Sequence, residues 1–167
     1  THDGLLHAAQ DPAEGAATLA LIERMMAGIG AAASYAGPQQ ELAETWADDM
    51  LWWGPEGIGA TYTIDRYIAQ HQQPFRRQAG KRVFNGHVAR LAEGCYGGFF
   101  GWPNLTMTPA GGFMGLPATG RAEADMRVVD IYRRAGDRLA ENWVFIDMLH
   151  FLNMQGLDVL ARLRDTA

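Results

Sequence analysis

Residues 115–156, GLPATGRAEADMRVVDIYRRAGDRLAENWVFIDMLHFLNMQG, decide the fold. The stretch predicts a turn, a strand, a tight reversal at residues 135–137, a second strand and the start of a closing helix. Because side chains alternate along a strand, one face of the first strand carries Met126, Val128, Asp130 and Tyr132. Asp130 is therefore the only carboxylate on an otherwise apolar face of this strand.

The second strand is apolar on both faces. One face carries Trp143, Phe145 and Asp147, and the other carries Val144, Ile146 and Met148. A strand without a polar side must be covered on both faces, and a second copy of the chain would supply the second cover. We therefore expect a homodimer formed through the sheet. Asp147 is a second acid within this apolar run, and burial of an unpaired carboxylate is costly or raises its pKa.

The length of 167 residues fits one domain, with an N-terminal arm over residues 1–10 and a single domain over residues 11–167. Cys95 is the only cysteine, so no disulfide can form within the chain, and no metal-ligand spacing surrounds it. No signal sequence or run of about 20 apolar residues is present, so we expect a cytoplasmic protein without a membrane segment. Because the first residue is Thr1, we expect a processed form or a part of a longer protein.

The charge balance narrows the ligand class. The formal net charge is −5, and the sequence has no run of lysines and arginines longer than Arg76-Arg77. This balance argues against a nucleic-acid or anionic-membrane surface. It favours a small neutral or cationic ligand.

Helical signals come before the strands. Asp11-Pro12-Ala13-Glu14 combines an N-cap acid, a proline at the first helical position and a glutamate three residues after the cap, so a helix begins there. A second short helix is predicted over residues 39–49, followed by a short strand or edge segment over 51–53. Thr63 caps a third helix, which Pro74 must kink or end.

The period then becomes strand-like. Strands are predicted over residues 82–91 and 96–107, with a glycine-rich connection over 109–119 and a last helix over 158–164. The glycines Gly97, Gly98 and Gly101 indicate sharp bending of a strand. Helices followed by a meander of antiparallel strands is an α+β order.

The chain resembles the SnoaL-like polyketide cyclases of the nuclear-transport-factor-2-like superfamily. Residues 114–121, MGLPATGR, are similar to the family's G-x-P-P-T-G-[RK] turn, and residues 151–156, FLNMQG, are similar to its LLRQLG-type ending. Between these two motifs, further segments similar to the family occur in the family's order, at residues 129–133, 136–139, 141–143 and Asp147. The resemblance implies a cone-shaped, curved antiparallel sheet covered by N-terminal helices.

The resemblance also marks two catalytic positions. Characterised cyclases of this family place an acid on the last strand, where this chain has Val144, and a histidine on the preceding strand, where this chain has Asp130. The family's acid and histidine are thus both replaced, so its aldol cyclisation does not carry over directly.

Three residues are candidate catalytic groups. Asp130 in a dry pocket would have a raised pKa and could serve as a general acid or base, whereas the alternative is a core carboxylate satisfied by its neighbours. Asp147 either faces the pocket or makes a structural hydrogen bond, for instance to helix amides. His87 could donate to a ligand oxygen or pair with an acid. His71 lies on the apolar stripe of the third helix, where it is either a core histidine or a pocket residue.

Aromatic and aliphatic residues complete the predicted pocket. An apolar cavity with few polar groups is typical of small-molecule sites. The predicted substrate-binding residues are Trp53, Tyr62, His71, Phe84, Trp102, Met126, Val128 and Val144. No pair of histidines has metal spacing, so neither a metal nor a cofactor is expected.

We therefore expect a cofactor-independent enzyme of cyclase, isomerase or dehydratase type that acts on a small hydrophobic carbonyl substrate. The alternative is a non-catalytic ligand-binding or dimeric assembly module on the same fold, because fold does not fix function. Hydrolysis of an ester or epoxide would require a water held between two acids.

Overall fold

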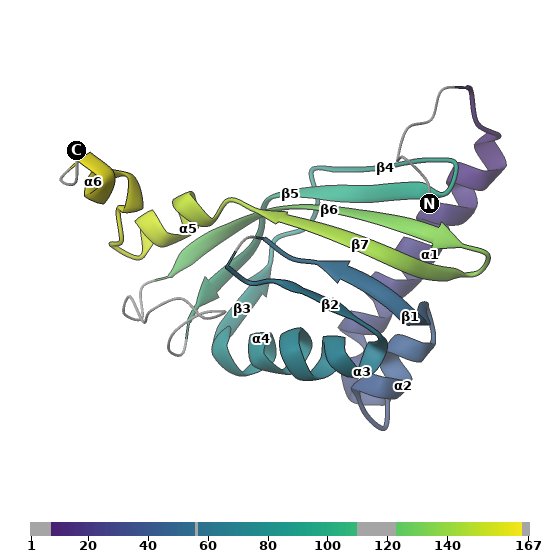
Figure 1. The fold of residues 1–167 in the computed structure, drawn as a ribbon, viewed down its shortest axis with the longest axis horizontal. Coiled ribbons are helices and arrows are strands. Elements are labelled where there is room, and N and C mark those ends of the chain that lie inside the picture. The colour runs from purple at the N-terminus through teal and green to yellow at the C-terminus, as the bar shows by residue number, and fades with distance from the viewer. Residues whose placement is uncertain (1–7, 56, 110–122, 165–167) are drawn as a thin grey trace.

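The computed structural model describes residues 8–55, 57–109 and 123–164 (Figure 1). The helical elements are α1 (Pro12–Gly30), the short turn η1 (Ala32–Ser34), α2 (Pro38–Ala43), α3 (Ile64–Tyr67), the π-helical turn η2 (Ile68–Gln72), α4 (Gln73–Gln78), α5 (Met148–Met154) and α6 (Val159–Arg164). The strands are β1 (Trp46–Trp53), β2 (Ala60–Tyr62), β3 (Lys81–Phe84), β4 (Ala89–Glu93), β5 (Tyr96–Thr108), β6 (Ala124–Ala135) and β7 (Arg138–Ile146). Most of the predicted arm and of the glycine-rich connection, and the motif at residues 114–121, lie outside the described residues.

The described strands form one curved, mixed sheet in the order β2-β1-β7-β6-β5-β3, with β4 also paired to β5. All neighbouring strands are antiparallel except β1 and β7, which run parallel. The predicted pair of strands and its reversal are confirmed, because β6 and β7 pair around Gly136, whose φ of 61° is a left-handed conformation that favours glycine. The α+β order of helices and strands is also confirmed.

Two predicted elements were wrong in extent. The helix predicted over residues 39–49 ends at Ala43, and the strand predicted over 51–53 begins at Trp46. β1 also lies between β2 and β7 rather than at the edge of the sheet. The cause is tertiary: Trp46, Met50 and Trp52 are buried on one face of β1, and parallel pairing with β7 satisfies its backbone.

The strand predicted over residues 82–91 is instead two strands, β3 and β4, on the same side of β5. They separate because β5 changes register between Gly101 and Leu105, where the strand bends. Glycine is required in this strand. A Cβ at Gly101 would lie 2.1 Å from the Asn104 Cβ, and one at Gly98 would lie 2.0 Å from the Asp130 carbonyl oxygen.

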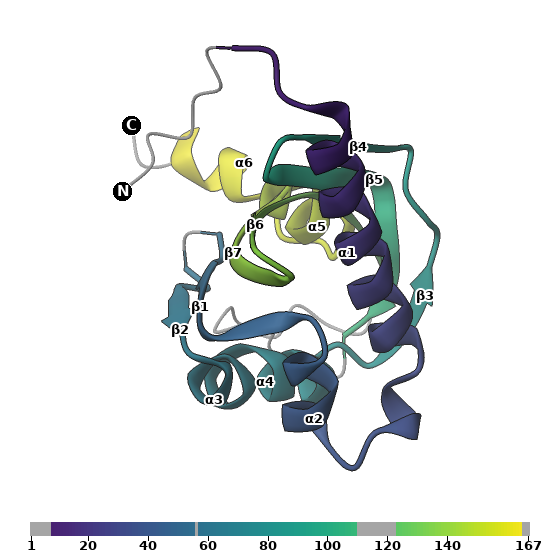
Figure 2. The same ribbon diagram turned by 90° about the vertical axis from the view of Figure 1, so that its right-hand side faces the viewer.

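Helices cover the concave face of the sheet, as Figure 2 shows, with α1 beside β4 and β5 and with α2 to α4 at the opposite end. One core cluster packs the helices α1, α2 and α3 against the sheet and includes Ile22, Met50 and Ile64. A second joins β5 and β6 to α5 around Met107, Met126 and Phe151.

The helix caps predicted at Asp11 and Thr63 are confirmed, since each side chain accepts a backbone hydrogen bond. Pro74 was predicted to kink or end the third helix; the α-helix is interrupted by the π-helical turn η2, which ends at Gln72, and α4 continues through Pro74 to Gln78.

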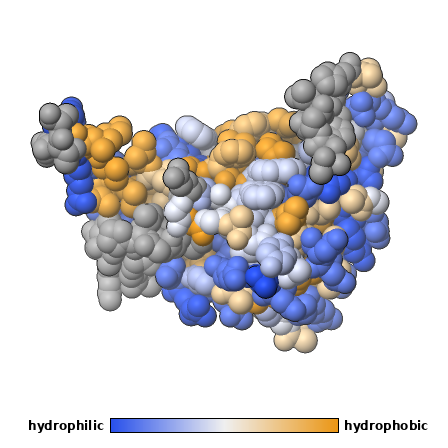
Figure 3. All heavy atoms as spheres, in the orientation of Figure 1, coloured by the Kyte–Doolittle hydropathy of each residue, from blue (hydrophilic) through white to orange (hydrophobic). Residues whose placement is uncertain are grey.

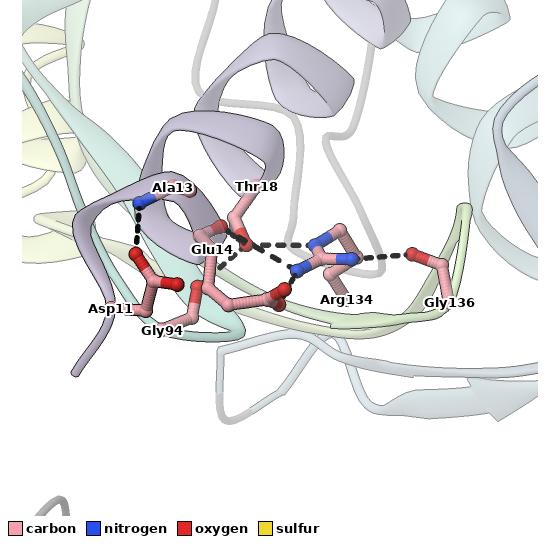
Figure 4. Close-up of polar contacts among 7 residues, drawn as sticks. All are labelled: Asp11, Ala13, Glu14, Thr18, Gly94, Arg134 and Gly136. Carbon is pink, nitrogen blue, oxygen red and sulfur yellow. Dashed lines mark hydrogen bonds and ion pairs between the residues drawn. The ribbon is translucent and has the colours of Figure 1, made fainter.

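Arg134 ties α1 to the hairpins of the sheet (Figure 4). Its Nε donates to Thr18 Oγ1 at 2.9 Å and its Nη1 to the Gly136 carbonyl at 2.6 Å, and its Nη2 is paired with Glu14. Thr18, which is fully buried, also donates to the Gly94 carbonyl at 2.7 Å. The start of α1 is therefore fixed to two turns that lie far along the sequence.

Apolar side chains remain on the outside of the molecule. Figure 3 shows them over α5 and α6 and along the upper edge of the view, where the long strands lie. On the outer face of β7, Phe145 is 59% exposed, so the predicted second cover for this strand is not supplied by the described chain. Among the described residues, no helix is long and apolar enough to cross a membrane.

Candidate functional site

A cavity of about 790 Å³ lies between the concave face of the sheet and the helices. Its wall is mainly apolar, with contributions from α1, α2, α4, β1 and β3 and from the three long strands β5 to β7. The polar side chains on the described wall are Glu41, Thr45, Tyr67, His71, Gln72, Arg76, Arg82, Asn104, Asp130, Tyr132 and Asn142. Size and composition suit a small, hydrophobic molecule with a few polar groups.

Asp130 is the centre of the polar part of this wall. Its Oδ1 accepts a hydrogen bond of 2.8 Å from Asn142 Nδ2, and its carboxylate also accepts one from the Tyr132 hydroxyl. Burial raises the pKa of Asp130 to about 6, because removal from water disfavours the ionised form, while these two hydrogen bonds oppose that rise. At neutral pH Asp130 is therefore mostly ionised but readily protonated.

The hairpin explains this cluster. Asp130 and Tyr132 are two residues apart on β6 and share its inner face, and Asn142 lies opposite Tyr132 on β7. Asn142 is only 4% exposed, and its Nδ2 also lies 3.1 Å from the Ile131 carbonyl. The amide is thus held between the backbone of β6 and the carboxylate.

Tyr67 completes the cluster from the helix side. Burial, together with the negative charge of Asp130, raises the pKa of Tyr67, so its phenol stays protonated and is a hydrogen-bond donor. Its ring packs against Trp46, with ring centroids 6.4 Å apart, and Trp46 packs against Tyr132 at 5.9 Å. Two neutral phenols therefore lie in the electrostatic field of one carboxylate.

His71 is a neutral group on the same helical segment. Burial lowers its pKa to about 4, and its ring stacks on Trp52 with centroids 3.8 Å apart. In the described part of the chain, no hydrogen-bond partner reaches His71 Nδ1 or the neighbouring Gln72 Oε1, and both atoms are buried. The π-helical turn brings these two consecutive residues to the cavity wall.

Six of the sequence-predicted site residues line this cavity. They are Asp130, His71, Phe84, Met126, Val128 and Val144. Val144 lies directly opposite Asp130 in the β6–β7 register, so the two positions at which the resemblance places catalytic groups are neighbours. The alternation predicted for β6 brings Met126, Val128, Asp130 and Tyr132 to one wall.

Asp147 and His87 do not line the cavity, which corrects their placement beside Asp130. Asp147 follows the last residue of β7 and caps α5, where its Oδ1 accepts from the His150 backbone N–H at 3.1 Å. Its other oxygen is paired with Arg127 at 3.3 Å. These contacts are the structural alternative that the sequence left open for this acid.

His87 lies behind Phe99, on which its ring stacks at a centroid distance of 3.9 Å. Its Nδ1 accepts from Arg90 Nε at 3.0 Å. Burial, with a smaller contribution from the Arg90 charge, lowers the pKa of His87. The structure thus separates this imidazole from Asp130 by the Phe99 side chain of the cavity wall.

The three aromatic residues Trp53, Tyr62 and Trp102 also lie outside this cavity. Trp53 is 44% exposed because its neighbour Trp52 occupies the inner face of β1, and successive strand residues point to opposite faces. Tyr62 and Trp102 each lie beneath an arginine guanidinium, Arg66 at 4.4 Å and Arg127 at 5.0 Å. They form cation–π contacts at the surface rather than a ligand site.

Wall residues that the sequence pattern did not predict include Trp52, Tyr67, Gln72 and Asn142. Counting across the predicted reversal at residues 135–137 does not place Asn142 opposite Tyr132, because the register of β6 and β7 shifts between Arg133 and Arg134. Tyr67 lies on the same apolar stripe as His71. No group of three or more potential metal ligands occurs among the described residues.

Comparisons with known proteins agree on the architecture. No family model and no curated protein matches the sequence. Among solved structures, a nuclear-transport-factor-2-like protein from Burkholderia xenovorans LB400 has a TM-score of 0.65 at 12% identity, covering 84% of this chain and 97% of that chain. A protein from Jannaschia sp. CCS1 assigned as a SnoaL-like polyketide cyclase has a TM-score of 0.62 at 19% identity, covering 91% and 98%.

A third similar structure is IdmH from Streptomyces antibioticus, assigned as a polyketide cyclase, with a TM-score of 0.60 at 14% identity over 84% of this chain and 99% of that chain. The structure is thus similar both to nuclear-transport-factor-2-like proteins and to proteins assigned as polyketide cyclases, in agreement with the resemblance found in the sequence. At these identities the similarity establishes architecture and not activity. The chain therefore has the nuclear-transport-factor-2-like fold, with SnoaL-like polyketide cyclases among its structural neighbours.

Proposed function

We propose that the protein is a cofactor-independent enzyme that moves a proton at the carbon next to a carbonyl group of a hydrophobic substrate, with Asp130 as the general acid and base. The supporting observation is the position of Asp130: a carboxylate with a pKa of about 6 on the wall of an apolar cavity. A base whose pKa lies near the working pH combines a useful ionised fraction with a useful proton affinity.

The surrounding residues suit the steps of such a reaction. The Asp130 carboxylate would accept the proton from the α-carbon, leaving the electron pair in an enolate whose charge resides on the former carbonyl oxygen. The Tyr67 phenol is a donor for that oxygen, and Asn142 holds the carboxylate in place. Return of the proton from Asp130 to a different carbon of the enolate would complete an isomerisation, and its transfer to a departing hydroxide would complete a dehydration. In a cyclisation the enolate carbon would attack a second carbonyl of the substrate, and the alkoxide oxygen formed there would take the proton from Asp130.

Exchange of α-protons tests this function without knowledge of the natural substrate. The protein is incubated in D₂O with 1-tetralone, a bicyclic ketone, and deuterium at the α-carbon is followed by NMR. We expect exchange above background, and Asp130→Asn should reduce that enhancement by about 100-fold or more. Asp125→Asn is the matched control, because Asp125 lies on the same strand outside the cavity wall and accepts from Thr106.

A non-catalytic binding module remains the second candidate, and one observation favours it: Val144 occupies the position of the family's acid beside Asp130. Under that function 1-tetralone binds without enhanced exchange, and Asp130→Asn changes neither property. Equal exchange by the wild-type protein and Asp130→Asn would contradict the enzymatic proposal.

We also propose that two copies associate through the outer face of the sheet. The apolar outer patch, defined as Trp53, Trp143 and Phe145, lines a shallow hollow on that face. Burial of this patch against a second copy would cover the side of β7 that the described chain leaves open.

A further inference from the structure

A basic segment lies at one end of the cavity. Residues 76–82, RRQAGKR, contain Arg76, Arg77, Lys81 and Arg82, four of the chain's 14 lysines and arginines, and no acid. The segment runs from the last turn of α4 into β3. In a chain with a net charge of −5, this is a local reversal of sign.

Two of these four side chains belong to the cavity wall. Arg82 and Phe84 share the inner face of β3, whereas Lys81 and Val83 alternate to the other face. The Arg82 guanidinium carbon lies 5.6 Å from the centroid of the Phe75 ring, which also lines the cavity. Arg82 is thus placed against the cavity by both its strand and an aromatic neighbour.

The charge of the second arginine is already neutralised. Arg76 Nη2 lies 3.0 Å and 2.9 Å from the two carboxylate oxygens of Glu41, which is 5% exposed. No ion pair to Arg82 occurs within the described ranges of the chain. Among the described wall residues at the end formed by α4 and β3, the positive charge without an ion pair is therefore that of Arg82, which is exposed to solvent on β3.

Asp130 and Arg82 lie on different strands of the same wall, since β5 separates β6 from β3. An anionic group on a ligand is attracted to Arg82 and repelled by ionised Asp130. These two effects favour the same orientation, with the anion at the basic end and the uncharged part of the ligand toward Asp130.

We propose that the substrate is a hydrophobic ring ketone that also carries an anionic group, a carboxylate or a phosphate ester, which Arg82 binds at the end of the cavity formed by α4 and β3. The ketone part rests on the proposed function, whereas the anionic part rests on the basic segment alone. The net acidic charge of the sequence predicted a neutral or cationic ligand, and the proposal departs from that prediction because the charge is distributed unevenly.

Two fluorescent probes with the same ring skeleton test the anionic part. These are 8-anilinonaphthalene-1-sulfonate and its uncharged analogue N-phenyl-1-naphthylamine. We expect Arg82→Gln to weaken binding of the sulfonate about tenfold and to leave binding of the neutral probe unchanged. Arg90→Gln is the matched control, because Arg90 is paired with Glu23 at 3.2 Å and does not line the cavity. Equal effects of Arg82→Gln on both probes, or no effect on either, would overturn the proposal.

Competition against the sulfonate probe then distinguishes the two anions. Tighter binding of 1-naphthoate than of 1-naphthalenemethanol supports a carboxylate, and tighter binding of 1-naphthyl phosphate supports a phosphate ester. If neither anion competes better than the alcohol, the proposal fails. Because these are binding measurements, their outcome is independent of α-proton exchange by Asp130, so failure of one proposal is distinguishable from failure of the other.

Discussion

The Asn142 side-chain amide donates to Asp130 Oδ1 at 2.8 Å, which joins β7 to β6 at the carboxylate that we propose as the acid and base. The bond stabilises the ionised form of Asp130 and opposes the effect of burial on its pKa. The proton affinity of this acid is therefore set by its neighbour across the hairpin as well as by the cavity.

Replacement of Asn142 by leucine should raise the pKa of Asp130 further above about 6, because a hydrogen bond to the carboxylate is lost while burial remains. The acid limb of the pH profile of α-proton exchange should move to higher pH. Asn85→Leu is a control, since the Asn85 amide donates to Thr106 at 2.8 Å outside the cavity wall. A pH profile that stays in place, or moves to lower pH, in Asn142→Leu would contradict the assignment.

The raised pKa of Asp130 makes stability depend on pH. A carboxyl group whose pKa is higher in the folded state, here about 6 against 3.8, binds its proton more tightly when folded. Its contribution to the free energy of unfolding is full below the unfolded-state pKa and is lost as the pH rises through about 6. Relative to Asp130→Asn, the wild-type protein should therefore lose about 2 kcal/mol between pH 4 and pH 7 in urea unfolding. A constant difference between the two proteins over this range would show that Asp130 is not buried as described.

Loss of Arg134 should destabilise the fold. Its guanidinium bonds to Thr18, Glu14 and the Gly136 carbonyl and is 13% exposed, whereas Glu14 is 60% exposed, so the main loss in Arg134→Met is the hydrogen bond to the buried Thr18 hydroxyl (Figure 4). We expect a decrease of about 1–3 kcal/mol in the free energy of unfolding measured with urea.

The control for Arg134 is Arg138→Met. Arg138 is paired with Asp137 in the same reversal, but the two side chains are 39% and 84% exposed, so its loss should cost less than about 1 kcal/mol. Similar losses in the two variants would mean that the contact between Arg134 and α1 adds nothing to stability.

The proposed dimer makes a separate prediction. Phe145→Asp places a charge in the outer patch, so the dimer should dissociate, which sedimentation equilibrium measures at micromolar concentration. Val88→Asp is the control, because Val88 is 69% exposed in the connection between β3 and β4. A monomeric wild-type protein, or a Phe145→Asp variant that stays dimeric, would refute association through this face.

Local alternation predicted the wall of the cavity better than any other signal. Met126, Val128, Asp130 and Tyr132 were assigned to one face from period alone, and all four line the cavity. The same rule gives no help with the adjacent tryptophans of β1, because a shift of one residue exchanges Trp52 and Trp53 between the faces. Only the pairing of β1 with β7 decides between them, and that pairing joins residues 46–53 to residues 139–143.

Two further features depended on information that is not local. Asp147 continues the apolar alternation of β7, but the strand ends at Ile146 and the acid caps the following helix. The residues of the basic segment are visible in the sequence, yet a count of charges over the whole chain hides their position. Their place beside the cavity follows from α4 and β3, which the sheet brings to the same end.

The parallel pairing of β1 with β7 has a consequence for the folding of the chain. Because β7 lies between β1 and β6, Asn142 reaches Asp130 only when β7 is in the sheet. In an unfolded chain Asp130 is hydrated, and its pKa would be that of an ordinary aspartate. The raised pKa of Asp130 would therefore serve as a marker that β7 has joined the sheet.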